Sequence, residues 1–125
     1  MSGEHSTVRV DDVEPKPSKS SGTDHVDLVE RLGCTEMRPK VWYLSPGDAM
    51  SYHRQTEQEE LYYVLRGPGR MKIAGELLDV QEGTAVRIPP ETDRQVLNDT
   101  DGEHVWLIVG APPATDDGRP ASGDA

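Results

Sequence analysis

Short apolar runs separated by turn residues dominate the chain from residue 40 onward. The expected strands cover residues 40–44, 51–55, 60–66, 70–74, 77–80, 84–88, 94–98 and 104–109. Glycine- and proline-rich breaks such as Gly67-Pro68-Gly69 and Pro89-Pro90 have the composition of turns. Many short strands with little helix between them predict an all-β fold, a small antiparallel barrel or sandwich.

Residues 24–33 form a different pattern, in which Val26, Val29 and Leu32 recur at helical spacing. Asp24 is suited to cap the N-terminus of this segment, and Gly33 is suited to the left-handed position past its end. The pattern therefore predicts one short N-terminal helix before the strands begin.

Two of the expected strands are apolar on both faces, residues 61–65 and 105–109. A strand with one face in water alternates between apolar and polar residues. Both faces are therefore expected to be covered, one by the barrel interior and the other by a second sheet, the N-terminal segment or a second subunit. From this pattern we predict a homodimer.

The two ends of the chain have the composition of tails. Residues 1–24 and 112–125 are rich in Pro, Ser, Gly and Asp and have almost no apolar pattern. The predicted organisation is a flexible N-terminal segment (1–24), one β-barrel domain (25–111) and a disordered C-terminal tail (112–125).

Charge and composition exclude several classes of partner. The formal net charge is −10, and no basic stripe is present, which argues against nucleic acid and anionic membrane surfaces. Asp is abundant and Lys is scarce, as in proteins of salt-adapted organisms, so a halophilic-like character is a hypothesis. A single cysteine, Cys34, and the lack of an apolar leader predict a cytoplasmic protein without disulfides.

Polar residues gather on the inward positions of two neighbouring strands. His53 and Gln55 share one side of their strand, and Glu60 and Tyr62 share one side of the next. If these strands pair, His53, Gln55 and Glu60 converge inside the barrel. Imidazole nitrogen and carboxylate oxygen are good ligands for divalent transition metals. Arg94 shares a face with Val96 on a later strand.

The spacing of these residues resembles the two motifs of the cupin superfamily. Gly47, His53, Glu60 and Gly67 match the first motif. Gly83, Pro89 and Asn98 match the second. The resemblance covers about residues 38–111. It implies a small single-domain barrel of the conserved cupin-2 type, with the jelly-roll or double-stranded β-helix fold.

The chain departs from the cupin motifs at the residues that hold metal. The second His of the first motif is Gln55, and the His of the second motif is Arg94. A guanidinium about 4 Å from a divalent cation is repelled by about 8 kcal/mol at an effective dielectric near 20. We therefore expect no tightly bound cofactor. Mn, Fe, Ni or Zn held by His53, Glu60 and Gln55 is the alternative.

Arg94 has two interpretations. In one, Arg94 and Glu60 satisfy each other's charge inside a closed barrel. In the other, Arg94 offers its guanidinium to a carboxylate or phosphate, while His53, Gln55, Glu60 and Tyr62 add polar contacts on apolar walls. The sequence favours the second, because a core filled only for packing needs no such polar cluster.

Three functions follow from these alternatives. We favour a small-molecule-binding protein with an anionic ligand in the barrel. The resemblance also allows a metal-dependent isomerase, dioxygenase or decarboxylase with His53 and Glu60 as ligands, or a metal-free enzyme with His53 as general base. The third function is a structural dimerisation module whose barrel is filled by side chains.

Overall fold

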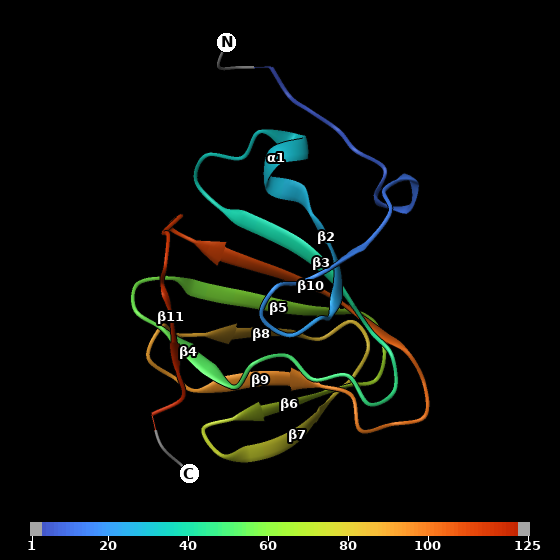
Figure 1. Cartoon of the computed structure of the whole chain (residues 1–125), viewed down its shortest axis with the longest axis vertical. Helices are drawn as coiled ribbons and strands as arrows, with labels where there is room; N and C mark the ends of the chain where they lie inside the picture. The colour runs from blue at the N-terminus through green and yellow to red at the C-terminus, as the bar shows by residue number, and fades with distance from the viewer. Residues whose placement is uncertain (1–3, 123–125) are drawn as a thin grey trace.

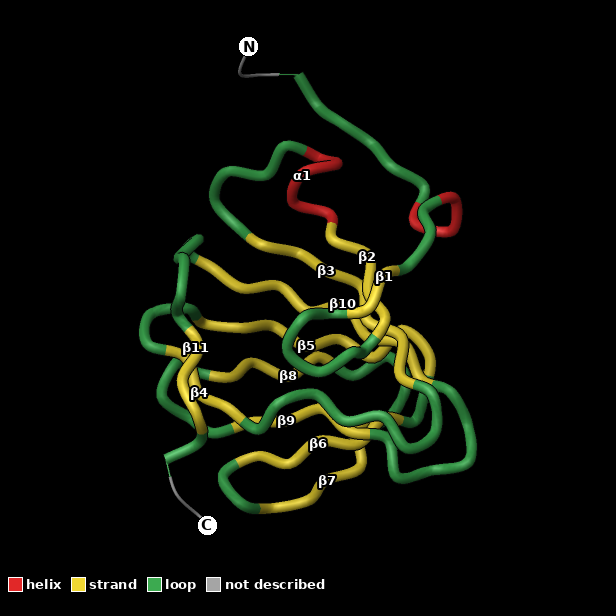
Figure 2. Tube along the Cα trace, viewed as in Figure 1, coloured by secondary structure: helices red, strands yellow, loops and turns green. Residues whose placement is uncertain are grey.

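The computed structural model describes residues 4–122, which form two antiparallel sheets packed face to face (Figure 1). The larger sheet has the order β1-β2-β3-β10-β5-β8, and the smaller sheet has the order β11-β4-β9-β6-β7. The strands are β1 (Lys16–Pro17), β2 (Asp24–Asp27), β3 (Arg38–Leu44), β4 (His53–Gln55), β5 (Glu59–Arg66), β6 (Gly69–Ile73), β7 (Glu76–Val80), β8 (Ala85–Ile88), β9 (Arg94–Leu97), β10 (His104–Ala111) and β11 (Gly118–Pro120). The predicted all-β jelly-roll barrel is confirmed, and helix is confined to two short stretches (Figure 2).

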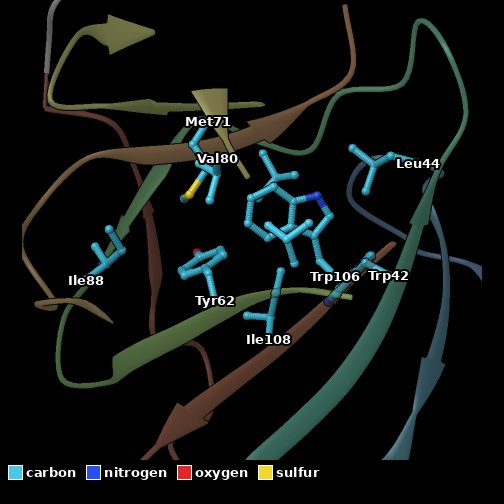
Figure 3. Packing of buried hydrophobic residues seen from close by; sticks show 10 residues of the cluster. Trp42, Leu44, Tyr62, Met71, Val80, Ile88, Trp106 and Ile108 are labelled. Carbon is cyan, nitrogen blue, oxygen red and sulfur yellow. The ribbon is translucent and has the colours of Figure 1, made fainter. Parts of the chain in front are cut away.

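The main core fills the space between the two sheets. Trp106 of β10 is fully buried at its centre, and Figure 3 shows its indole ring among side chains of both sheets. Tyr62 meets the Trp106 ring edge-on, at a centroid distance of 6.3 Å. The buried members of this core are Trp42, Leu44, Tyr62, Val64, Met71, Val80, Ile88, Val96, Trp106 and Ile108.

Strand register orders the inward side chains of the larger sheet into rungs. Trp106 pairs with Trp42 of β3 and Val64 of β5, and this rung is wholly apolar. Four residues further along β10, Gly110 pairs with Arg38 and Glu60. Because side chains alternate along a strand, both rungs face the interior. The same three strands therefore run from an apolar end at Trp106 to a polar end at Gly110.

A second, smaller core covers the outer face of β3 and β10. Val26, Val41 and Val105 are buried in it, and Val8, Val10 and Val13 of the N-terminal segment pack against them. The outer face of β10 is thus covered by the N-terminal segment, one of the expected alternatives. Leu61 and Leu65 of β5 remain exposed, at 42% and 46%. The homodimer stays a prediction.

The N-terminal helix is shorter than predicted. Residues 24–27 form strand β2, which pairs with β3, and helix α1 covers only Leu28–Leu32. Asp27, not Asp24, caps it by accepting a hydrogen bond from the Val29 N–H at 2.9 Å. Gly33 adopts the expected left-handed conformation, with φ of 72°. The helical prediction failed at its start because pairing with β3 buries Val26 in the second core.

Secondary structure extends into both segments that the sequence predicted as tails. Strands β1 and β2 form a hairpin whose tip, residues 18–23, is held by hydrogen bonds among Ser18, Ser21 and Thr23. Strand β11 pairs with β4 near the other end of the chain. Composition does not reveal these strands, because their pairing partners lie far away in sequence. Residues 1–3 and 123–125 of the predicted tails lie outside the described residues, and among 4–122 no helix is long and apolar enough to cross a membrane.

Candidate functional site

A cavity of about 610 Å³ opens at the polar end of the barrel. Its floor and one wall come from inward residues of β3, β5 and β10, and another wall comes from β4 and the loop before it. The segments predicted as tails close it: Ser20 and Ser21 from the tip of the β1–β2 hairpin, and Asp117, Gly118, Arg119 and Pro120 from the C-terminal segment. A volume of this size is typical of small-molecule sites.

Glu60 lies at the centre of a hydrogen-bonded cluster on the cavity wall. Its Oε1 accepts hydrogen bonds from the Tyr62 hydroxyl at 2.7 Å and from Arg94 Nε at 3.1 Å. Burial and the nearby Glu60 carboxylate raise the pKa of the Tyr62 phenol well above its usual range. Tyr62 therefore stays protonated and acts as a donor to Glu60.

Arg94 lies behind this wall and does not reach the cavity. Its side chain is fully buried, and it is not among the residues that line the cavity. Besides Glu60, the guanidinium donates through Nη1 to the carbonyl oxygens of Pro90 and Thr92 at 2.9 and 2.6 Å. The arrangement is that of the first interpretation, in which Arg94 and Glu60 satisfy each other. The sequence instead favoured a guanidinium directed at a ligand.

His53 of β4 faces the same wall from the opposite sheet. Its Nδ1 lies 3.1 Å from the carbonyl oxygen of Ser51, and its Nε2 lies 4.0 Å from Glu60 Oε1. A carbonyl oxygen only accepts hydrogen bonds, so Nδ1 carries a proton, and in the neutral ring Nε2 is an acceptor. The distance between Nε2 and Glu60 is too long for a direct hydrogen bond. The two groups therefore border a gap.

Gln55 lines the cavity, but its amide nitrogen is engaged with other residues. Nε2 donates to Gln58 Oε1 at 3.1 Å and to Asp117 Oδ2 at 3.0 Å. Asp117 also accepts from the backbone N–H groups of Thr56, Glu57 and Gln58. Burial raises the pKa of the Asp117 carboxyl, but these hydrogen bonds outweigh burial and hold the pKa below its usual value. Gln55 and Asp117 together fasten the C-terminal segment over the cavity.

Three cationic residues on the cavity wall were not predicted from the sequence: Arg38, Lys40 and Arg119. Arg38 and Lys40 share the inward face of β3 with Trp42 and Leu44. The sequence did contain a signal for Arg38 and Lys40, because they are cationic residues on the inward face of an otherwise apolar strand. Arg119 carried no such signal, because it lies in a segment with tail composition. The lining carries three cationic side chains and two carboxylates, Glu60 and Asp117, and Arg94 pairs with Glu60 from outside the lining, so the wall keeps a net positive charge.

The residues considered as metal ligands do not fit a metal site. Among residues 4–122, no group of three or more His, Cys, Asp or Glu side chains is arranged to hold a metal ion. Glu60 is occupied by Arg94 and Tyr62, and Gln55 is turned toward Asp117. His104, another histidine of the barrel, is buried beside Trp106 at the apolar end, where it accepts a hydrogen bond from the indole N–H at 2.8 Å.

Solved structures share this architecture. The polyketide cyclase RemF from Streptomyces resistomycificus aligns with a TM-score of 0.81 and 20% identity, covering 94% of this chain and 86% of RemF. A sugar phosphate isomerase from Silicibacter pomeroyi aligns with a TM-score of 0.78 and 20% identity, covering 94% of this chain and 88% of the isomerase. A predicted oxalate decarboxylase from Thermotoga maritima gives 0.75 and 18%, covering 86% and 99%. At these identities the likeness concerns the fold alone.

Sequence comparison gives the family. An uncharacterized protein of Methanocaldococcus jannaschii, MJ1618, is 35% identical over 52 residues, which cover 42% of each chain. The chain thus matches less than half of the length of this curated relative. The family described as Cupin domain, Cupin_2, matches residues 40–110, more than half of the chain. These residues contain His53, Glu60 and strands of both sheets, and the chain belongs to the cupin family.

Proposed function

We propose that this cupin binds a small anionic molecule in the cavity at the polar end of its barrel. The observation that carries the proposal is the charge of the wall. Arg38, Lys40 and Arg119 line the cavity, while the carboxylates of Glu60 and Asp117 are already engaged by donors. Charged hydrogen bonds to a carboxylate or phosphate are roughly twice as strong as neutral ones.

Charge selectivity supports the same conclusion. The whole chain has a formal net charge of −10, so a cationic wall is contrary to its overall composition. An anion that approaches such a protein is repelled by the surface and is attracted only where cations gather locally. Burial of Trp42 and Ile108 beside Lys40 gives the cavity an apolar floor, which adds affinity for the body of a ligand.

The proposal excludes a directly coordinated metal. Arg94 neutralises Glu60 from behind, and it acts on the ligand only by holding Glu60 in place. His53 and Tyr62 add polar contacts on the wall, as the sequence predicted. A second copy of the chain, packed against the exposed leucines of β5, is part of this proposal as the expected assembly.

The test compares anions with a neutral molecule of the same size. Propyl phosphate, propionate and propanol are titrated while amide chemical shifts are followed by NMR. We expect saturable shifts around β3 for the two anions and none for propanol. The double variant Arg38→Met/Lys40→Met removes two wall charges and is expected to weaken anion binding by at least tenfold.

The matched control is Arg66→Met, which removes one charge from an exposed arginine paired with Glu103. This variant is expected to bind the anions as the unchanged protein does. Equal binding of propanol and propionate, or anion binding that survives loss of Arg38 and Lys40, would overturn the proposal.

A further inference from the structure

We infer that the ligand of this cavity is a hydroxylated anion, whose hydroxyl groups are recognised by His53 and Glu60. The inference rests on the proposed function, because it takes the anion site of Arg38, Lys40 and Arg119 as given. It adds a second recognition element, a pair of acceptors on the opposite side of the cavity.

The first step is the state of His53. In the neutral ring with its proton on Nδ1, which faces the Ser51 carbonyl, Nε2 has a lone pair and lies 4.0 Å from Glu60 Oε1. Both side chains line the cavity and are partly accessible, at 23% for His53 and 14% for Glu60. No described donor is hydrogen-bonded to His53 Nε2, so this acceptor is available to a ligand.

The second step is the state of Glu60. Its Oε1 receives both hydrogen bonds of the cluster, from Tyr62 and Arg94, and among residues 4–122 no donor is hydrogen-bonded to Oε2. A carboxylate has about four acceptor positions. Glu60, which lines the cavity, therefore retains acceptor capacity at Oε2.

The third step is the distance. Nε2 and Oε1 lie 4.0 Å apart, which is less than twice the length of an O–H···O or O–H···N bond. A hydroxyl oxygen at hydrogen-bond distance from Nε2 can therefore also lie close to the Glu60 carboxylate. Because a hydroxyl has one proton, each hydroxyl group donates to a single acceptor. A diol on adjacent carbons supplies one donor to His53 and one to Glu60.

An ammonium group is the competing donor, and charge decides against it. Arg94 already lies 3.1 Å from Glu60 Oε1, and Arg38 and Lys40 line the same cavity. An added cation meets this uncancelled positive charge, whereas a neutral hydroxyl does not. Sugar acids and sugar phosphates combine the required anion and diol. A sugar phosphate isomerase is among the proteins of similar fold.

The experiment uses three phosphates on one carbon skeleton. Propyl phosphate has no further polar group, glycerol 3-phosphate carries the adjacent diol, and 3-aminopropyl phosphate carries an ammonium. Their dissociation constants are measured by NMR titration of the full chain. We expect glycerol 3-phosphate to bind about tenfold more tightly than propyl phosphate, and 3-aminopropyl phosphate to bind no more tightly. Glycerate against propionate repeats the comparison for a carboxylate.

The variant His53→Leu assigns the effect to its residue. It is expected to remove the preference, so that glycerol 3-phosphate and propyl phosphate bind this variant with equal affinity. His53→Gln, which restores a polar acceptor, is expected to recover part of the difference. The control is His5→Leu at an exposed histidine outside the cavity.

The outcomes separate the inference from the proposed function. Equal affinities for glycerol 3-phosphate and propyl phosphate, or tighter binding of 3-aminopropyl phosphate, overturn the hydroxyl inference while the anion site stands. A diol preference that persists in His53→Leu also overturns it. If phosphate binding does not depend on Arg38 and Lys40, the proposed function is overturned instead.

Discussion

The two ends of the barrel are built by the same three strands, β3, β10 and β5, and yet they have opposite character. At one end Trp106 and Val64 lie in a filled apolar core, and at the other Arg38, Gly110 and Glu60 form a polar rung. The first end is closed by apolar side chains from the opposite sheet. The second is covered by the tip of the β1–β2 hairpin and by residues 117–120, and it keeps a cavity of about 610 Å³.

The two ends differ in the side chains that occupy the space between the sheets. Apolar side chains at the closed end fill the space between the sheets without specific partners, because burial itself is favourable. At the open end several buried groups are polar, and Gln55, Arg94 and Asp117 are each held by named donors or acceptors. The structure of the open end therefore depends on a few hydrogen-bonded pairs, and a mutation disrupts it only where it removes a member of such a pair.

The largest expected effect is at Arg94, on the open end. Arg94→Met leaves Glu60 partly buried without its counter-ion and leaves the carbonyl oxygens of Pro90 and Thr92 without a donor. Loss of one partner from a buried ion pair costs about 4 kcal/mol of unfolding free energy. Urea unfolding followed by tryptophan fluorescence measures it.

A neighbouring pair supplies the control. Arg87 pairs with Glu59 on the exposed face, where both side chains are more than half accessible, and Arg87→Met is expected to cost less than about 1 kcal/mol. The double variant Glu60→Gln/Arg94→Met should recover part of the loss, because no unpaired charge remains. Equal costs for the two arginines would mean that Arg94 is not buried as described.

The second prediction compares two glycines, one at each end. A Cβ at Gly69 would overlap the Trp106 ring, with Cε2 at 2.9 Å. A Cβ at Gly110 would lie 3.0 Å from Gln58 Oε1, the end of a flexible side chain. Overpacking of a rigid core costs about 3 kcal/mol, and a neighbour that moves aside reduces this cost to about 1 kcal/mol. Gly69→Ala is therefore expected to destabilise more than Gly110→Ala.

Thermal and urea unfolding of both alanine variants measure the difference. Gly110→Ala also has a local readout, because displacement of Gln58 shifts the amide resonances of the segment that Asp117 holds. If Gly110→Ala lowers the unfolding free energy as much as Gly69→Ala does, the open end is packed as tightly as the closed one.

The contrast also explains which features the sequence could predict. The closed end follows from local pattern, since Val64, Val96 and Trp106 lie in short apolar runs that predict strands. His53 and Glu60 of the open end were predicted from spacing, and the structure brings them within 4.0 Å. The polar role of Gln55 was recognised, but its partner Asp117 is 62 residues away. No local pattern encodes such a pairing.

The burial of Arg94 was missed for a related reason. Spacing placed it on an inward face, which is correct, but an inward face contains both cavity wall and filled interior. The carbonyl oxygens of Pro90 and Thr92 hold the guanidinium in the filled part. Only the path of the preceding turn decides this, and the sequence does not show that path.

The smallest expected effects concern pH, and they separate the two ends again. At the closed end, burial lowers the pKa of His104 below its ordinary value of 6.5, against the opposing influence of Asp99 and Glu103. Its Nδ1 accepts the Trp106 N–H, so a second proton requires the loss of that bond. At the open end, hydrogen bonds hold the pKa of Asp117 below 3.8.

Both groups bind protons more readily in the unfolded chain, so both make the protein less stable as pH falls. The loss from His104 begins as pH falls through about 6.5, and the loss from Asp117 begins only below about 4. His104→Gln keeps an acceptor for the indole and does not titrate, so the unfolding free energy should become flat between pH 7 and 5. Asp117→Asn should reduce only the loss below pH 4, to which Asp99, whose pKa Arg70 lowers, also contributes. His5→Gln, at an exposed histidine, is expected to retain both steps, and a flat profile in that variant would assign the upper step to a histidine outside the barrel.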